Sequence, residues 1–158
     1  MTRRKQGGYF KTERDGPAPL AVQVRHWVRF SEVDPMAIAW HGRYLQYFEI
    51  AAEALGRKIG LSYADYFNAQ LRAPVVQAHV DYHHPVRLGE QVTIRAQLVW
   101  TEAVRLNTEY RVETGAGRLA ATGYTVQMLT DAASGVPCYV APPLLARCRA
   151  RWRQGELP

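Results

Sequence analysis

Residues 30–49 read FSEVDPMAIAWHGRYLQYFE, and the spacing of apolar residues changes inside this stretch. From Ala21 to Phe30 apolar side chains alternate with polar ones, a period of two that predicts a half-buried strand. From Tyr44 to Ile59 apolar residues recur at intervals of three and four, which predicts an amphipathic helix that ends at Gly60. The chain therefore passes from a strand through a short loop into a long helix.

Four further runs of alternating residues follow along the chain. They cover residues 76–82, 92–100, 104–112 and 119–129. Two of the connections, residues 101–103 and 115–117, are short enough for hairpins, which join antiparallel strands. Residues 61–71 are ambiguous and leave room for a short helix around residues 63–68. These elements indicate an α+β fold in which an antiparallel sheet of about five strands wraps around one long helix.

Length and composition favour one globular domain. The 158 residues, of which 47% are hydrophobic and 22% charged, are enough to bury a core without disulfides or metal ions. Residues 1–20 are polar, basic and interrupted by Gly and Pro, so we expect a flexible N-terminal tail there. We place the domain at residues 21–145 and a basic C-terminal tail at residues 146–158.

The formal net charge of +6 favours anionic ligands without identifying them. Nucleic acid, a phosphorylated ligand and a solvated basic surface are all compatible with it. The basic run Arg147–Arg153 lacks the context of a nucleic-acid-binding fold. We therefore expect a solvated helical tail and no nucleic-acid partner.

The sequence contains no sign of export, of a membrane span or of a metal site. No apolar stretch approaches ~18 residues, and no apolar segment follows the pair Arg3-Arg4. Cys138 and Cys148 lack the spacing of a zinc site or a disulfide framework. His79, His83 and His84 are expected on a surface or interface, because no cysteine or carboxylate motif surrounds them. We expect a cytoplasmic protein without a cofactor, a metal ion or a membrane partner.

The outward-facing positions of the expected sheet include large apolar side chains. Trp27 and Val99 are examples, and such residues are unfavourable in contact with water. We therefore expect a homo-oligomer, a homodimer or a homotetramer.

Asp34 and the start of the long helix form the strongest candidate for a site of chemistry. Pro35 favours an extended backbone at Asp34, so strand geometry is expected to continue to this acid. His41 and Gly42 lie at the helix start, where backbone N–H groups lack partners and the helix dipole is positive. An acid beside free amides suits acyl transfer, but Asp34 could equally be a turn acid or a partner of the helix end.

The stretch from Phe30 to Glu49 resembles the signature of hot-dog-fold acyl-CoA thioesterases of the 4-hydroxybenzoyl-CoA thioesterase type. The shared features are an aromatic residue four positions before Asp34, His41 at the helix start, and the run Tyr-Leu-Gln-Tyr-Phe-Glu after Arg43. The resemblance covers about residues 22–143. It implies a hot-dog fold and hydrolysis of an acyl-CoA or acyl-carrier-protein thioester by a metal-free site at a subunit interface.

The resemblance also implies roles for individual residues. Asp34 would be the nucleophile or the general base, and the backbone N–H of His41 would polarise the thioester carbonyl. The His41 imidazole could assist proton transfer, or His41 could donate its amide alone. Substrate contacts are expected from Met36, Ile38, Trp40, Tyr44 and Arg105.

Two positions depart from the family pattern. Ala37 stands where the pattern has Gly, and Arg43 stands where it usually has Asn. A non-catalytic module that binds acyl thioesters therefore stays open. A hot-dog dehydratase acting on 3-hydroxyacyl thioesters is a separate alternative, although the residues around Asp34 fit the pattern of that branch poorly. The sequence leaves the acyl group and the choice between CoA and carrier protein undecided.

Overall fold

The computed structural model describes residues 8–158. Residues 1–7, part of the expected N-terminal tail, lie outside the described residues. The elements, including two 3-10 turns named η1 and η2, are β1 (Leu20–Trp27), η1 (Phe30–Glu32), η2 (His41–Arg43), α1 (Tyr44–Ile59), α2 (Tyr63–Asn68), β2 (Leu71–Arg72), β3 (Val75–Tyr82), β4 (Gln91–Val99), β5 (Arg105–Glu113), β6 (Leu119–Met128), β7 (Thr130–Asp131) and α3 (Pro143–Arg153).

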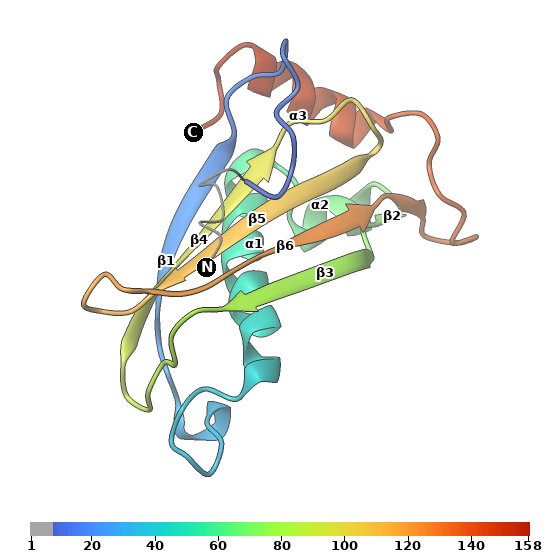
Figure 1. Cartoon of the computed structure of the whole chain (residues 1–158). Helices are drawn as coiled ribbons and strands as arrows, with labels where there is room; N and C mark the ends of the chain where they lie inside the picture. The colour runs from blue at the N-terminus through green and yellow to red at the C-terminus, as the bar shows by residue number, and fades with distance from the viewer. Residues whose placement is uncertain (1–7) are drawn as a thin grey trace.

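One antiparallel sheet contains five strands in the order β1-β4-β5-β6-β3, and α1 lies against one of its faces (Figure 1). On that face Phe48 stacks on Tyr110 of β5 with 4.3 Å between the ring centroids. The helix can approach this closely because β6 has Gly123, where a Cβ atom would stand 2.6 Å from the Phe48 ring. The predicted α+β fold, a sheet of five strands around one long helix, is confirmed.

The predicted strands at residues 76–82, 92–100, 104–112 and 119–129 correspond to β3, β4, β5 and β6, with ends that differ by no more than one residue. Helix α2 occupies the segment that was ambiguous, and Ser62 caps it by accepting the N–H of Asp65. The pair β2 and β7 forms a small second sheet. Two-residue strands show no periodicity, so the sequence did not predict them.

The first strand ends at Trp27, so the expectation that strand geometry reaches Phe30 and continues to Asp34 is wrong. The N–H of Val28 still donates to the Glu90 carbonyl at 2.9 Å, and the chain then enters η1. The Glu32 carboxylate accepts the N–H of Arg29 at 2.8 Å. This local side-chain bond stabilises the 3-10 turn, which replaces the last part of the expected strand.

The described residues that precede β1 contact the sheet and the C-terminal helix. The Tyr9 hydroxyl donates to Asp81 at 2.6 Å, and the Phe10 N–H donates to Glu109 at 2.8 Å. Further along, the Ala18 carbonyl accepts the indole N–H of Trp152 at 2.7 Å. This part of the expected tail therefore makes side-chain contacts with the sheet and with α3.

Helix α3 lies near the end of the sheet where β1 begins (Figure 1). Leu145, Cys148 and Trp152 are buried, and the basic side chains occupy its other faces. The boundary expected at residue 146 lies inside this helix. No helix in residues 8–158 combines the length and the apolar composition that crossing a membrane requires.

Candidate active site

Asp34 lies at the tip of a short hairpin between η1 and η2. Val33 and Ala39 form an antiparallel bridge, and the Asp34 N–H donates to the Ile38 carbonyl at 2.9 Å. The Ala37 N–H returns to the Asp34 carbonyl, also at 2.9 Å. Ala37 has a φ of 60°, the left-handed conformation that usually follows the turn in a hairpin loop of this kind. The loop therefore holds Asp34 by its backbone on both sides.

The Asp34 carboxylate stabilises its own turn and leaves the helix start free. Its Oδ1 accepts the N–H of Met36 at 2.8 Å, while Oδ2 has no hydrogen-bond donor among residues 8–158. The N-cap residues of η2 and α1, Trp40 and Arg43, make no side-chain capping bond within the described residues. Of the alternatives left open by the sequence, the turn acid is observed and the helix-capping acid is not. One carboxylate oxygen is available to a substrate or a water molecule.

The helix start presents backbone N–H groups. Within the described part of the chain, the amides of His41 and Gly42 donate to no acceptor. The backbone around them is held in place, because the Tyr82 hydroxyl donates to the His41 carbonyl at 2.7 Å and the Trp40 N–H donates to the Glu32 carbonyl at 2.9 Å. Free amides at the positive end of a helix can stabilise an oxyanion.

Trp40 packs on this turn. Its ring centroid is 4.8 Å from that of His41, and a Cβ atom at Gly42 would stand 2.1 Å from Trp40 Cζ3. Gly42 therefore allows the indole to lie over the backbone of η2. A side chain at position 42 would displace the indole from the amides.

The other predicted substrate residues differ in exposure. Met36 is 72% exposed and Trp40 is 47% exposed, whereas Ile38 is partly buried and forms a bridge with Arg87. Tyr44 is only 3% exposed and makes edge contacts with the rings of Tyr47 and Tyr82. Burial raises the pKa of the Tyr44 phenol. Met36 and Trp40 are exposed at the surface, whereas Tyr44 is part of the core beneath the helix start.

Arg105 does not lie with the others. It starts β5 and pairs with Met128, at the end of the sheet where β1 begins, whereas Asp34 follows the opposite end of β1. Arg105 instead lines a groove of about 440 Å³ together with Val126 and Tyr139. Within one chain, the structure brings Asp34, Met36, Ile38, Trp40, His41 and Tyr44 onto one hairpin and helix start and leaves Arg105 apart.

A polar cluster behind the hairpin was missed by the sequence reasoning. The Glu32 carboxylate lies 2.9 Å from His26 Nε2 and accepts the Tyr47 hydroxyl at 3.2 Å. The side chains of His26 and Glu32 are only 10% and 13% exposed. Burial alone would raise the pKa of Glu32, but hydrogen bonds from the Arg29 N–H and from His26 lower it below its usual value. The signal available was His26, a polar residue at an inward-facing position of the first strand.

Among residues 8–158, no three His, Cys, Asp or Glu side chains are grouped in a way that could hold a metal ion. His79 stacks on Tyr124 with centroids 5.5 Å apart, and its Nε2 lies 3.1 Å from Asp81. His83 contacts the Thr122 hydroxyl at 2.8 Å. His79 lies on the edge strand β3, and His83 directly follows the end of this strand.

Comparison with known proteins identifies the class. Residues 28–148 match the thioesterase-like superfamily, and the chain belongs to this superfamily. It is 31% identical over 146 residues to a proposed esterase, sll0410, of Synechocystis sp. (strain PCC 6803), which covers 90% of this chain and 83% of that protein. It is also 26% identical over 110 residues to a proposed acyl-CoA thioesterase, YneP, of Bacillus subtilis (strain 168), which covers 70% of this chain and 80% of that protein.

Solved structures have the same fold. The DHNA-CoA thioesterase of Staphylococcus aureus superimposes with a TM-score of 0.75 at 23% identity, over 86% of this chain and 95% of that one. The hot-dog fold expected from the resemblance is confirmed.

Proposed function

We propose that this protein hydrolyses an acyl-CoA thioester, with Asp34 as nucleophile or general base and the His41 amide as oxyanion donor. The observation that supports this most directly is the pairing of a carboxylate that has a free oxygen with a helix start whose N-cap residues make no side-chain capping bond within residues 8–158. Kinship with a proposed acyl-CoA thioesterase supports the same reaction. A carrier-protein thioester would present the same carbonyl and stays a second substrate class.

Two routes give the same balance of atoms. As a general base, Asp34 takes a proton from water while the water oxygen bonds to the acyl carbon. As a nucleophile, Asp34 bonds to that carbon and forms a mixed anhydride, which water then hydrolyses. In both routes the carbon–sulfur bond breaks, the sulfur leaves as a thiolate that takes up a proton, and the free acid is released. One N–H donor to the oxyanion contributes about 3 kcal/mol, or roughly a hundredfold in rate.

The acyl group would lie against Met36, Ile38 and Trp40. Two of these side chains are exposed, and the Trp40 indole lies over the turn that carries the free amides. An aromatic ring beside the reacting carbonyl suits a flat acyl group, because aromatic rings stack in offset or edge geometry. We therefore propose an aryl-CoA of the 4-hydroxybenzoyl type as the first substrate to assay.

We also propose that the protein is a homodimer that pairs through β3. This strand occupies one edge of the sheet, and Val75, Val76 and Tyr82 on it are each more than half exposed. A twofold axis would place the Val75 end of one β3 against the Tyr82 end of the other. Since Tyr82 bonds to His41, and Arg105 lies at the Val75 end, the partner's Arg105 would approach the hairpin of Asp34. There it would contact CoA phosphates.

A cytoplasmic location is part of the proposal. Cys138 and Cys148 are both free thiols, which is usual in a reducing compartment. The Cys148 thiol is buried, and burial raises its pKa to about 11, so it stays protonated and unreactive.

The first test is thiol release from a panel of aryl, short-chain and long-chain CoA esters and one carrier-protein thioester. Asp34→Asn keeps the shape of the side chain and removes its basicity, so turnover should fall at least about a thousandfold, the size expected for loss of both the acid–base and the nucleophilic role. Asp15→Asn, at an exposed position of the N-terminal segment, is the matched control and should retain full activity.

The outcome also separates the alternatives. Wild-type activity in Asp34→Asn would rule out the assignment of this residue. Loss of water from 3-hydroxyacyl-CoA without thiol release would indicate a dehydratase. A rise in melting temperature with acyl-CoA, but without any product, would indicate a binding module.

A further inference from the structure

The buried carboxylate of Glu32 connects three elements around the candidate site. It contacts His26 of β1 at 2.9 Å, accepts the N–H of Arg29 before η1 at 2.8 Å, and accepts the hydroxyl of Tyr47 in the first turn of α1 at 3.2 Å. The side chain is 13% exposed, so these bonds lie largely out of water. A buried carboxylate with several donors is held firmly, because losing any donor leaves an unsatisfied charge.

The backbone of the same residue holds the hairpin. The Glu32 carbonyl accepts the N–H of Trp40, the residue before His41. The next residue, Val33, forms the bridge to Ala39 and precedes Asp34 directly. Glu32 therefore lies two residues before Asp34 in one arm of the hairpin. In the other arm it faces Trp40, the residue directly before the free amides of His41 and Gly42.

We infer that Glu32 is a positioning residue, whose carboxylate sets the distance between the Asp34 carboxylate and the helix-start amides by fastening the hairpin to β1 and α1. This inference rests on the proposed function. Small errors of placement are costly in such a site, since a shift of about 1 Å reduces turnover about a hundredfold. Glu32 itself touches no reacting atom.

The Arg43 side chain acts at the same place and supports this arrangement. Its guanidinium donates to the Ser31 carbonyl at 2.9 Å and to Gln46 at 3.0 Å, so it connects η1 with the first turn of α1. Arg43 replaces the Asn that is usual in the family pattern. The Arg43 guanidinium therefore connects η1 to α1 through two hydrogen bonds.

The test compares three variants in the full-length protein, assayed by thiol release on the best wild-type ester. Glu32→Ala should lower kcat about a hundredfold and leave KM within about threefold, because the hairpin shifts while the acyl and CoA contacts remain. Glu32→Gln should recover most of that loss, to within about tenfold of wild type. Its amide oxygen can accept from Arg29 and Tyr47 while its NH2 group faces His26.

Tyr47→Phe removes one bond and keeps the ring that packs against His26 and Tyr44. It should lower kcat about threefold to tenfold, and should have no further effect when combined with Glu32→Ala. Glu113→Gln, at an exposed ion pair on β5, is the matched control and should not change kcat. If Glu32→Ala fails to fold, Tyr47→Phe alone decides.

Values of kcat within twofold of wild type in both Glu32→Ala and Tyr47→Phe would overturn the inference. A KM that rises in proportion to the fall in kcat would also overturn it, because that result indicates general loss of the site. If the wild type is active and Asp34→Asn is inactive, the proposed function stands, and the kinetics of Glu32→Ala and Tyr47→Phe test only the role of Glu32. A wild type without thiol release on any ester rejects the proposed function and the role of Glu32 together.

Discussion

Ala37, which stands where the family pattern has Gly, has an unusual backbone conformation. Its φ of 60° lies in the left-handed region, where a Cβ atom costs roughly 1–2 kcal/mol and Gly has no such cost. The left-handed conformation at this position explains why the family pattern has Gly there. The other bonds of the hairpin keep Ala37 in this conformation, which stores strain beside the candidate site.

Ala37→Gly should therefore stabilise the protein. Relief of the left-handed strain outweighs the larger chain entropy of Gly in the unfolded state, and the net gain should be about 0.5–1 kcal/mol. Ala37→Val should destabilise it by more than about 1 kcal/mol, since a β-branched residue is rarely found at positive φ. Urea unfolding of the three proteins measures both changes. A less stable Gly variant would contradict the strain argument.

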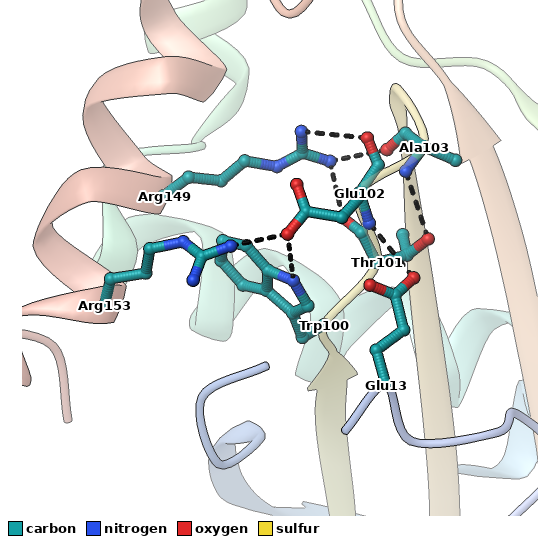
Figure 2. A network of polar contacts seen from close by, with 7 residues as sticks. All are labelled: Glu13, Trp100, Thr101, Glu102, Ala103, Arg149 and Arg153. Carbon is teal, nitrogen blue, oxygen red and sulfur yellow. Dashed lines mark hydrogen bonds and ion pairs between the residues drawn. The ribbon is translucent and has the colours of Figure 1, made fainter. Parts of the chain in front are cut away.

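At the scale of elements, α3 is fastened to the β4–β5 hairpin by two arginines. The Arg149 guanidinium points at the hairpin and donates to the backbone carbonyls of residues 101–103, and Arg153 bonds to the Glu102 carboxylate (Figure 2). The Arg153 guanidinium also lies 4.4 Å from the centre of the buried Trp100 ring. Two cations of the C-terminal basic run are thus engaged within the chain, which reduces its capacity for nucleic acid.

Arg149→Gln should lower the free energy of unfolding by about 2 kcal/mol, because a shorter neutral side chain leaves hairpin carbonyls without their charged donor. Arg147→Gln is the matched control on the same helix. Its side chain is exposed, so the change should stay within about 0.5 kcal/mol. Thermal unfolding followed by tryptophan fluorescence distinguishes the two. Equal melting temperatures would mean that the arginine contacts contribute nothing to docking of α3.

For the whole molecule, the open edge of β3 decides how a second copy can pair. The His83 N–H donates to Ala120 of the neighbouring strand at 2.8 Å, and N–H groups along an antiparallel strand alternate in direction. The N–H groups of Ala78 and Val80 therefore point to the open edge. They are the donors that a partner strand would use.

Ala78→Pro removes one of these donors without removing a bond to β6, since Pro is tolerated where the N–H faces outward. We expect the wild type to be a dimer and the Pro variant to be a folded monomer, as measured by light scattering coupled to gel filtration. Ala78→Ser keeps the N–H and should remain dimeric. The monomer should also lose thiol release, because the partner's Arg105 no longer approaches Asp34. A dimeric Pro variant would exclude pairing through β3.

Much of the fold could be predicted from the sequence, because the signals are local. The change of period between residues 30 and 44 defined the first strand and α1, and Gly60 ends the helix as expected, with a φ of 79°. Helix α3 was expected to be a solvated tail because of its many arginines. It packs on the domain instead, through the helically spaced apolar residues Leu144, Leu145, Cys148 and Trp152. The strand before Asp34 was predicted too long, because the bond from Arg29 to Glu32 outweighs the alternation there.

The sequence by itself determined the types and order of the main elements and placed Asp34 close to a helix start, because periodicity, Pro35 and the helix ends act over a few neighbouring residues. The tertiary structure alone decided which side chains meet. His26, Glu32 and Tyr47 come from three elements, Arg149 reaches a hairpin 46 residues away in the chain, and Arg105 lies at the far end of the sheet. Such partners depend on strand register and helix docking, which arise only when the whole core packs.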